Sequence, residues 1–419
     1  MGHNDRTKGE SGKICLFLIV RLDLIVRLAD SLSTDASMLI SRLILKNWRN
    51  FQAIDVTLGD RMFLIGPNAC GKSNFLDVFR FLRDIAKQGG GLQQAVSERG
   101  GVSKIRCLYA RRYPEIEIEV HLAERSGESP TWRYALGVKQ KRGASNPLRL
   151  TYEKVWQGDQ ILLSRPTTED HNDELRLAQT HLEQVNANTH FRGIAQFFES
   201  IFYLHLVPQL LRYPDAFSGS GLPDDPFGRS FLERLMRTPE RTRRARLRKI
   251  EAALRAAVPQ LRNLTDTKDS MGIPHLEAVY EHWRPNAGKQ QEDQFSDGTL
   301  RLIGLLWSLL ETDSLLLLEE PELSLNPEIV RQIPAVIHRV QGNRRRQVLM
   351  STHSPELLND YGIGGEEVLI LQPSEEGTHV KVAADKQEIL SLLQAGLSIA
   401  EAAMPYAKPV GIENLRSFR

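Results

Sequence analysis

A single stretch near residue 70 constrains the fold of this chain more than any other part of it. Residues 63–74 read FLIGPNACGKSN and match the pattern G-x-x-x-x-G-K-[ST] in full. An apolar run precedes the match and the sequence FLDVFRFL follows it, which predicts a strand, a loop and a helix in that order. Gly66 and Gly71 allow the backbone amides of the loop to face inward at the start of the helix, where they form a site for anions.

The side chains of this loop indicate which anion it binds. Lys72 can reach the β- and γ-phosphates of a nucleotide, and the Ser73 hydroxyl can ligate Mg²⁺. We therefore predict a nucleoside triphosphate site; a chance match on an ordinary strand–helix turn is the alternative. The residues predicted to bind the nucleotide are Gly66, Pro67, Asn68, Ala69, Cys70, Gly71, Lys72, Ser73 and Asn74.

Composition places few limits on function. The chain has 419 residues, of which 25% are charged and 41% hydrophobic, as in a globular protein with a large core. The net charge of +2 argues neither for nor against a nucleic-acid partner. Cys15, Cys70 and Cys107 are too widely spaced for a disulfide framework or a zinc site, so a reducing cytosol is the expected setting. Cys70 is interpreted as a small filler residue, with an oxidisable thiol as the alternative.

The first 37 residues differ from the rest of the chain. The sequence LIVRL occurs at residues 18–22 and again at 24–28. Arg21, Asp23 and Arg27 interrupt the apolar run, so no stretch long enough to span a membrane is expected, and no signal-peptide cleavage site follows. We interpret residues 1–37 as a poorly ordered extension, with an amphipathic anchor as the alternative, and residues 38–419 as one ATP-binding domain.

From residue 38 onward the hydrophobic pattern predicts an α/β fold. Alternating charged and apolar residues at 115–122 predict a half-buried strand. The other predicted strands are residues 39–45, 56–58, 62–65, 131–138, 148–156, 314–318 and 347–351. Residues 115–156 are expected to form an antiparallel β-lobe, and residues 169–259 an inserted helical lobe. Residues 388–396 predict an amphipathic helix within a C-terminal docking segment at about 385–419.

A strongly basic helix is expected inside the helical lobe. Residues 237–249 read RTPERTRRARLRK and contain seven basic side chains. Such a helix can neutralise several phosphates of a nucleic acid. A solvated helix face explains the same composition, and the sequence leaves the two interpretations open.

Three further motifs lie in the final third of the chain. Residues 296–299 read SDGT and precede an apolar helix, and the apolar run at 314–318 ends in Glu319-Glu320-Pro321-Glu322. This pattern fits a buried strand that Pro321 ends and whose tip carries two carboxylates. A second buried strand, residues 347–351, leads to His353. Taken singly, the motifs are ordinary for a turn, a charged surface and a structural histidine. Their order after the phosphate loop makes a site the better interpretation.

In this order, the four motifs resemble those of ATP-binding-cassette (ABC) type ATPases of the RecF, SMC and OLD branch, over Met38 to about Leu371. The resemblance implies an ABC-type P-loop ATPase head with a mixed β-sheet core that binds ATP and Mg²⁺. It implies that Glu319 joins Ser73 at the metal, and that Glu320, His353 and Lys72 are catalytic. It also implies that the nucleotide contacts the signature motif, which consists of Ser296, Asp297, Gly298 and Thr299.

The sequence departs from this family in two places. Glu319 replaces the usual aspartate, although the sequence Glu-Glu-Pro-Glu resembles that of the OLD-like branch. Asn326, in the predicted D-loop at residues 323–326, stands where this branch often has histidine. The glutamine of the Q-loop has no clear match, and Gln93 and Gln94 are the candidates.

The resemblance further implies a partner and a mechanism. A signature motif acts on the nucleotide of a second subunit, so two heads are expected to close head-to-tail on two ATP molecules about a two-fold axis. Ser296 would then contact the γ-phosphate bound by the partner, and hydrolysis would release the dimer.

The biological role stays open at this point. About 220 residues without heptads separate Ser73 from Ser296, which excludes the long-armed SMC architecture. Only 66 residues follow His353, and they lack the Glu and Asp-x-Asp pair of a Toprim nuclease domain. The leading hypothesis is the ATPase subunit of a bacterial or phage-related defence system that regulates an effector in trans, such as a Toprim-type nuclease. The alternatives are a RecF-like repair ATPase that acts directly on DNA, and a non-hydrolysing sensor, which Glu320 disfavours.

Overall fold

The computed structural model describes residues 38–110, 114–140, 148–214, 225–281, 288–311, 314–343, 346–409 and 411–417. The predictions for residues 1–37 therefore lie outside the described residues. Among the described residues, no helix is long and apolar enough to cross a membrane.

A six-stranded central sheet organises the fold. Its strand order is β15-β14-β3-β13-β12-β8, and all neighbours are parallel except β15, which pairs antiparallel with β14. The strands are β3 (Arg61–Ile65), β8 (Phe202–Leu204), β12 (Leu316–Glu319), β13 (Val348–Ser351), β14 (Val368–Ser374) and β15 (Gly377–Val382). Alternate residues of β3 enter two different hydrophobic cores, Met62 and Leu64 one of them, Phe63 and Ile65 the other. Burial on both faces explains why these strands are continuous apolar runs in the sequence.

An antiparallel sheet of order β2-β1-β4-β5-β6-β7 forms the predicted β-lobe. Its strands are β1 (Leu39–Trp48), β2 (Phe51–Thr57), β4 (Ile116–Ala123), β5 (Trp132–Gln140), β6 (Leu148–Gln157) and β7 (Gln160–Arg165). The helix after the phosphate loop, α2 (Lys72–Ala86), packs in the core between this sheet and the central one. Helices α3 (Leu92–Glu98), α4 (Val102–Ile105) and α6 (Arg192–Glu199) contribute side chains to the same core, and the short helix α5 (Thr168–Asn172) follows β7 in the chain.

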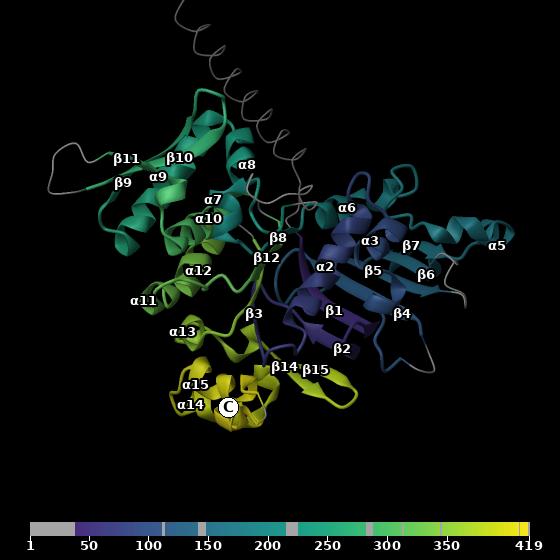
Figure 1. Cartoon of the computed structure of the whole chain (residues 1–419). Coiled ribbons are helices and arrows are strands. Elements are labelled where there is room, and N and C mark those ends of the chain that lie inside the picture. The colour runs from purple at the N-terminus through teal and green to yellow at the C-terminus, as the bar shows by residue number, and fades with distance from the viewer. Residues whose placement is uncertain are drawn as a thin grey trace, which may run out of the picture. The chain divides into compact units, whose positions relative to one another are not determined.

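The other face of the central sheet is covered by helices from the second half of the chain (Figure 1). These are α7 (Pro208–Arg212), α8 (Phe231–Arg237), α9 (Glu240–Ala257), α10 (Asp297–Glu311), α11 (Pro327–Val330), α12 (Ile333–Asn343), α13 (Pro355–Leu358), α14 (Gln387–Gln394) and α15 (Ile399–Ala403). A small antiparallel sheet of β9 (Leu261–Lys268), β10 (Pro274–Tyr280) and β11 (Lys289–Gln291) packs beside α8 and α9. The sequence analysis did not anticipate this third sheet.

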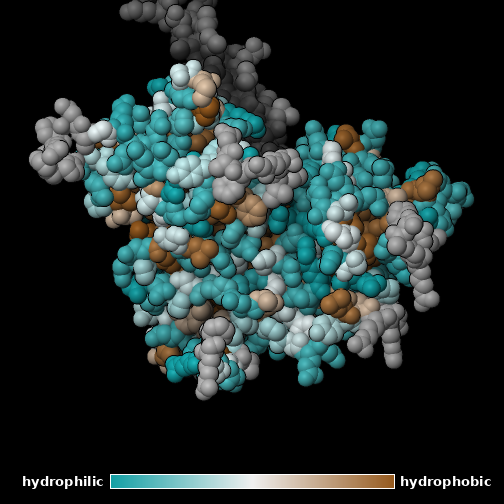
Figure 2. All heavy atoms as spheres, in the orientation of Figure 1, coloured by the Kyte–Doolittle hydropathy of each residue, from teal (hydrophilic) through white to brown (hydrophobic). Residues whose placement is uncertain are grey.

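Two predictions about the outline of the domain need correction. The segment 169–259 is not purely helical, because it contains β8, the edge strand of the central sheet. The amphipathic helix near residue 390 exists as α14, but its apolar side chains Ile389 and Leu393 pack into the core of the same chain. That apolar face is therefore occupied within the chain. Hydrophilic residues cover most of the face drawn in Figure 2, where hydrophobic residues form separate small groups.

Candidate functional site

The phosphate loop connects the end of β3 to the start of α2, as predicted. A Cβ atom on Gly66 would lie 2.4 Å from the carbonyl oxygen of Leu371 in β14. A Cβ atom on Gly71 would lie 2.2 Å from the Asn50 amide nitrogen, and Gly71 has a φ of 102°, which other residues rarely adopt. Gly66 is therefore required by its close contact with β14, and Gly71 by its positive φ and by the adjacent Asn50 side chain.

The Lys72 side chain turns back over this loop. Its Nζ donates hydrogen bonds to the carbonyl oxygens of Gly66 at 3.2 Å and Pro67 at 3.3 Å. Burial lowers the pKa of Lys72, and the neighbouring Cys70 and Glu320 oppose this shift. Charged phosphate oxygens are stronger acceptors for an ammonium group than neutral carbonyl oxygens are. The position of Lys72 therefore suits a nucleotide phosphate at the loop.

The Cys70 thiol is packed under the same loop. It is fully buried, its Sγ lies 3.9 Å from Lys72 Nζ, and burial raises the pKa of Cys70. A buried thiol with a raised pKa forms little thiolate and reacts slowly. The geometry favours a filler residue over an oxidisable one.

Side chains at the end of β1 and in the turn that follows it hold the phosphate loop in place by hydrogen bonds. The sequence did not indicate these contacts. The Asn50 amide donates to the Cys70 carbonyl and to the Thr378 hydroxyl, each at 2.8 Å. Asn74 donates to Asn50 Oδ1 at 2.7 Å, and Trp48 Nε1 donates to the Asn74 carbonyl at 3.0 Å. Asn74, predicted to bind nucleotide, thus holds the start of α2 in place. No local pattern marks Asn50, because its partners come from two distant parts of the chain, the phosphate loop with the start of α2, and β15.

The two predicted metal ligands meet beside the loop. The Ser73 hydroxyl donates to Glu319 Oε1, and the Tyr203 hydroxyl donates to Glu319 Oε2. His205 Nδ1 lies 3.2 Å from the Glu319 carbonyl oxygen. Burial raises the pKa of Tyr203, and the negative charge of Glu319 raises it further, so the hydroxyl stays protonated and donates. Tyr203 and His205 come from β8 and the residue after it, the strand hidden in the segment expected to be helical.

Glu320 and His353 also lie together, as predicted. Their side chains approach to 3.5 Å between Glu320 Oε1 and His353 Nε2. Glu320 has a φ of 45°, so the backbone turns sharply just after β12. Burial lowers the pKa of His353, as does the charge of Lys72, so the ring is neutral near pH 7. A carboxylate beside a neutral imidazole can accept a proton from water.

Glu322, two residues further along, links the two strand ends. Its Oε1 accepts from the Thr352 hydroxyl at 2.6 Å and from the His353 amide at 3.2 Å. Its side chain is 8% exposed, and burial raises the pKa of Glu322. The carboxylate therefore fixes the backbone of His353 relative to Glu320. Glu322 is the last residue of the motif Glu319-Glu320-Pro321-Glu322, but the sequence alone indicated no role for it.

The predicted signature residues lie at the start of α10. The Ser296 hydroxyl accepts from the Thr299 amide at 3.1 Å and lies 2.8 Å from the Thr299 hydroxyl, so it caps the helix. Asp297 forms an ion pair with Arg212 at 2.7 Å. A Cβ atom on Gly298 would lie 2.7 Å from the carbonyl oxygen of Ser324 in the predicted D-loop. Among the described residues, no hydrogen bond or ion pair joins the signature motif to the phosphate loop of the same chain.

The candidates for the Q-loop glutamine serve other purposes. Gln93 donates to the carbonyl oxygens of Leu148 and Ala178, each at 2.8 Å, and Gln94 donates to Glu98 at 2.9 Å. Gln209, which follows β8 at the start of α7, instead donates to Asp297 Oδ2 at 2.8 Å. Gln209 is thus the glutamine that contacts the signature motif.

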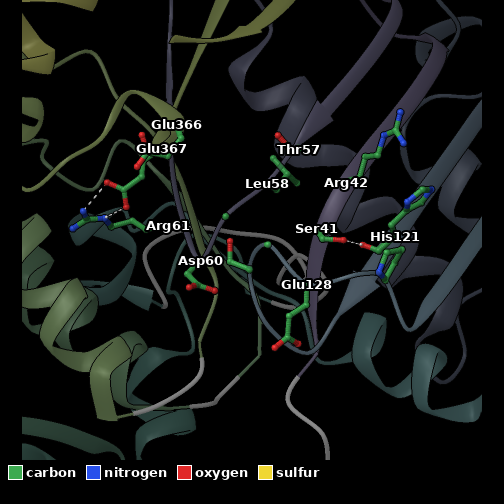
Figure 3. A pocket seen from close by; sticks show the side chains of 14 residues that line it. Ser41, Arg42, Thr57, Leu58, Asp60, Arg61, His121, Glu128, Glu366 and Glu367 are labelled. Atoms are coloured by element: carbon green, nitrogen blue, oxygen red, sulfur yellow. Dashed lines mark hydrogen bonds and ion pairs between the residues drawn. The ribbon is translucent and has the colours of Figure 1, made fainter. Parts of the chain in front are cut away.

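A polar cavity of about 640 Å³ lies at the opposite end of the central sheet (Figure 3). Asp60 and Arg61, at the start of β3, line it together with Glu367, which pairs with Arg61 at 2.8 Å. The phosphate loop follows the carboxyl end of β3, where ligands of parallel sheets bind. This cavity is therefore separate from the nucleotide site.

A comparison with known protein families identifies the family of this chain. The sequence matches, over residues 61–359, the family described as "AAA domain, putative AbiEii toxin, Type IV TA system". The matched range contains the phosphate loop, Glu319, Glu320 and His353. No curated protein matches the sequence.

Several solved structures are similar to the chain. The SMC head domain from Thermotoga maritima is 14% identical with a TM-score of 0.43, covering 82% of this chain and 98% of that one. An SMC head bound to the C-terminal winged-helix domain of ScpA is 13% identical with a TM-score of 0.46, covering 82% and 97%. An SMC head with an extended coiled coil, bound to the C-terminal domain of ScpA from Pyrococcus furiosus, is 11% identical with a TM-score of 0.47, covering 85% and 100%.

Proposed function

The chain belongs to the family described as "AAA domain, putative AbiEii toxin, Type IV TA system", and from this premise we propose that it hydrolyses ATP and uses ATP to close two heads into a dimer. It is an ATPase of the ABC and SMC class, with the P-loop head fold. The proposal adds the individual roles of its residues, the dimer and a partner protein.

One observation carries the proposal. The Ser73 hydroxyl and the Glu319 carboxylate, 246 residues apart in the chain, are in hydrogen-bond contact beside the phosphate loop. Glu320 and His353 lie next to this pair. A phosphoryl-transfer site needs groups that hold the phosphates, ligate the metal and position the attacking water. This arrangement offers one set of side chains for each requirement.

The geometry supports a proposed role for each residue. Lys72 and the loop amides would hold the β- and γ-phosphates, with Asn50 keeping the loop in shape. Glu320 would accept the proton of the attacking water, and the neutral His353 ring would orient that water and the carboxylate. Such catalysis consists of positioning and electrostatic stabilisation, without a covalent intermediate.

The residues present fit Mg²⁺. A hydroxyl and a carboxylate are the oxygen ligands that this ion prefers, and Ser73 and Glu319 would hold it. The described residues contain no group of three or more His, Cys, Asp or Glu side chains suited to a metal. Phosphate oxygens and water would therefore complete the coordination. When bound, Mg²⁺ neutralises charge on the β- and γ-phosphates.

The signature motif supports a two-fold dimer. Its contacts are to α7 and to the D-loop, and Leu323 in that D-loop is 40% exposed. Ser296 and Gly298 would then contact the γ-phosphate held by a second copy. A two-fold axis would place two ATP molecules between the same pair of surfaces.

The proposal is tested with the purified full-length chain. Phosphate release from ATP and the sedimentation of the chain are measured in Mg²⁺ and in EDTA. We expect hydrolysis in Mg²⁺ only, and a dimer fraction that rises with ATP. Absence of phosphate release in Mg²⁺ would overturn the proposal. Hydrolysis by a chain that stays strictly monomeric with ATP would remove the dimer alone.

The family description supports a partner protein. It names a toxin of a type IV toxin–antitoxin system, which is a two-component system. We propose that this ATPase controls an effector encoded beside it, such as a nuclease. Adding the proteins of neighbouring genes to the assay above should change the ATPase rate severalfold for the true partner.

A nucleic-acid partner is the second candidate, and α9 is the observation that favours it. Arg241, Arg244 and Arg248 are exposed and follow the i, i+3, i+7 spacing of a single helix face. Arg243 does not belong to this surface, because it is buried and pairs with Asp266 at 2.9 Å. Of the two interpretations that the sequence left open, nucleic-acid binding can therefore involve only the exposed basic side chains of this run.

Reversing Arg241, Arg244 and Arg248 to glutamate should weaken binding to all DNA sequences alike if this face contacts phosphates. Each lost phosphate contact reduces the salt dependence by roughly 0.9 log units of affinity per log unit of salt. Binding is measured by fluorescence anisotropy between low and physiological salt. The matched control reverses Lys104, Arg125 and Lys139, which are exposed elsewhere. Equal losses in both variants would indicate a general charge effect and exclude a site on α9.

A further inference from the structure

The edge strand β8 contributes a side chain to the metal-side carboxylate that no motif describes. Tyr203 pairs in register with Leu317 of β12, so its side chain lies on the same face of the sheet as that of Glu319, two residues after Leu317. We propose that Tyr203 is a positioning residue for Glu319: its hydroxyl fixes Oε2, so that Oε1 stays turned toward Ser73. The inference rests on the proposed function and adds a residue to its site.

The two oxygens of Glu319 have different partners. Oε2 accepts from Tyr203, and Oε1 accepts from Ser73. A carboxylate with a single partner could rotate and offer either oxygen. With one oxygen held by a phenol, the other has a defined direction. Hydrogen bonds from surrounding residues commonly orient metal-binding carboxylates in this way.

Tyr203 is itself buried and packed against a side chain of α2. Its side chain is 5% exposed, and the Arg80 guanidinium lies 4.2 Å from the centre of its ring. Arg80 follows Ser73 on α2 by two helical turns, so both residues lie on the same side of that helix. Helix α2 therefore contacts the carboxylate through Ser73 and the aromatic ring through Arg80. Movement of the ring is restricted by the same helix that carries the phosphate loop.

The length of the Glu319 side chain explains why a hydrogen bond from Tyr203 would matter. Glutamate has one more rotatable bond than the aspartate usual at this position, and ordering that bond costs conformational entropy. The Tyr203 hydroxyl offsets this cost by restricting the carboxylate before a ligand arrives. His205 adds a contact to the Glu319 carbonyl oxygen at 3.2 Å, which holds the backbone of the same residue. Strand β8 and the residue after it thus contact both the side chain and the backbone of Glu319.

The test is Tyr203→Phe, which removes the hydroxyl and keeps the ring beneath Arg80. Binding of a fluorescent ATP analogue to the full-length chain is measured while Mg²⁺ is titrated. Loss of an orienting partner typically lowers metal affinity about 10–100-fold. We expect the Mg²⁺ concentration for half-maximal binding to rise by that factor, with binding in EDTA and the melting temperature unchanged.

Tyr134→Phe is the matched control. Tyr134 is also buried and also donates to a glutamate, Glu153, at 3.1 Å in the β-lobe. Its Mg²⁺ titration should match that of the wild type. If Tyr203→Phe does not fold, Tyr203→Met keeps an apolar side chain without a donor and provides the same test.

Each outcome decides the inference. A wild-type Mg²⁺ titration for Tyr203→Phe would overturn the positioning role and leave the proposed function intact. Equal weakening of binding in Mg²⁺ and in EDTA would indicate a packing role only, and would also overturn it. Failure of the wild-type chain to bind the analogue with Mg²⁺ would overturn the proposed function, and the inference with it.

Discussion

Lys72→Ala is expected to abolish ATP binding and hydrolysis while leaving the chain folded. The ammonium group lies over the phosphate loop and would contact two phosphates. A hydrogen bond to a charged group contributes about 1.5–3 kcal/mol. Losing two of them lowers affinity by roughly 10²–10⁴-fold. Binding is measured by calorimetry with ATP and Mg²⁺.

The fold should tolerate this change. Burial lowers the pKa of Lys72, so the folded state disfavours its charged form relative to the unfolded chain. Alanine removes that penalty together with the side chain. Lys104→Ala, at an exposed position on α4, is the control and should bind ATP as the wild type does. Wild-type ATPase activity in Lys72→Ala would disprove the assignment of the phosphate loop.

Glu320→Gln should slow hydrolysis without weakening ATP binding. Glutamine keeps the size of the side chain and loses the charge and basicity that water activation needs. A positioned general base contributes about 10²–10⁴-fold to the rate, and a loss of this size is expected. Because ATP persists, the heads should also remain paired for longer. Phosphate release and sedimentation with ATP and Mg²⁺ measure the two effects.

A second substitution tests whether the dimer uses the signature motif. Ser296→Arg in the Glu320→Gln background should dissolve the ATP-dependent dimer, because the larger side chain would not fit around the partner's γ-phosphate. Ser296 also caps α10, and losing a cap costs about 1 kcal/mol, so the melting temperature is measured in parallel. Ser97→Arg, at an exposed position on α3, should leave the dimer intact. A Glu320→Gln chain that stays monomeric in saturating ATP would show that the isolated chain does not form the clamp.

The same contacts support the proposed metal-side role of a glutamate. Ser73 and Tyr203 hold one oxygen each of Glu319, so the longer side chain would present a ligand in a defined direction. The Glu322 carboxylate likewise holds part of the site in place, because it accepts a hydrogen bond from the backbone amide of His353. The two glutamates that flank Glu320 therefore support the geometry around it.

The sequence by itself determined the parts of this protein whose signals are local. The phosphate loop, α2 and the central strands β3, β12 and β13 follow from glycine positions and from apolar runs within a few residues of one another, whereas β8, β14 and β15 were not predicted. The alternation at residues 115–122 likewise predicted β4, because a half-buried strand imposes its period on consecutive residues. The pairing of Ser73 with Glu319 was expected only through resemblance to a family, and the structure brings these two side chains together.

Only the tertiary structure decided which side chains complete the site. Asn50 and Tyr203 act through partners 20 to 328 residues away, and such contacts leave no periodic trace in the sequence. Strand β8 has three residues, too few for a pattern, and is defined by its pairing with β12. Arg243 and Arg244 are adjacent and chemically identical, yet the first is buried and the second exposed. Successive residues of a helix point in different directions around its axis. Only the packing of α9 against its surroundings decides which face meets solvent.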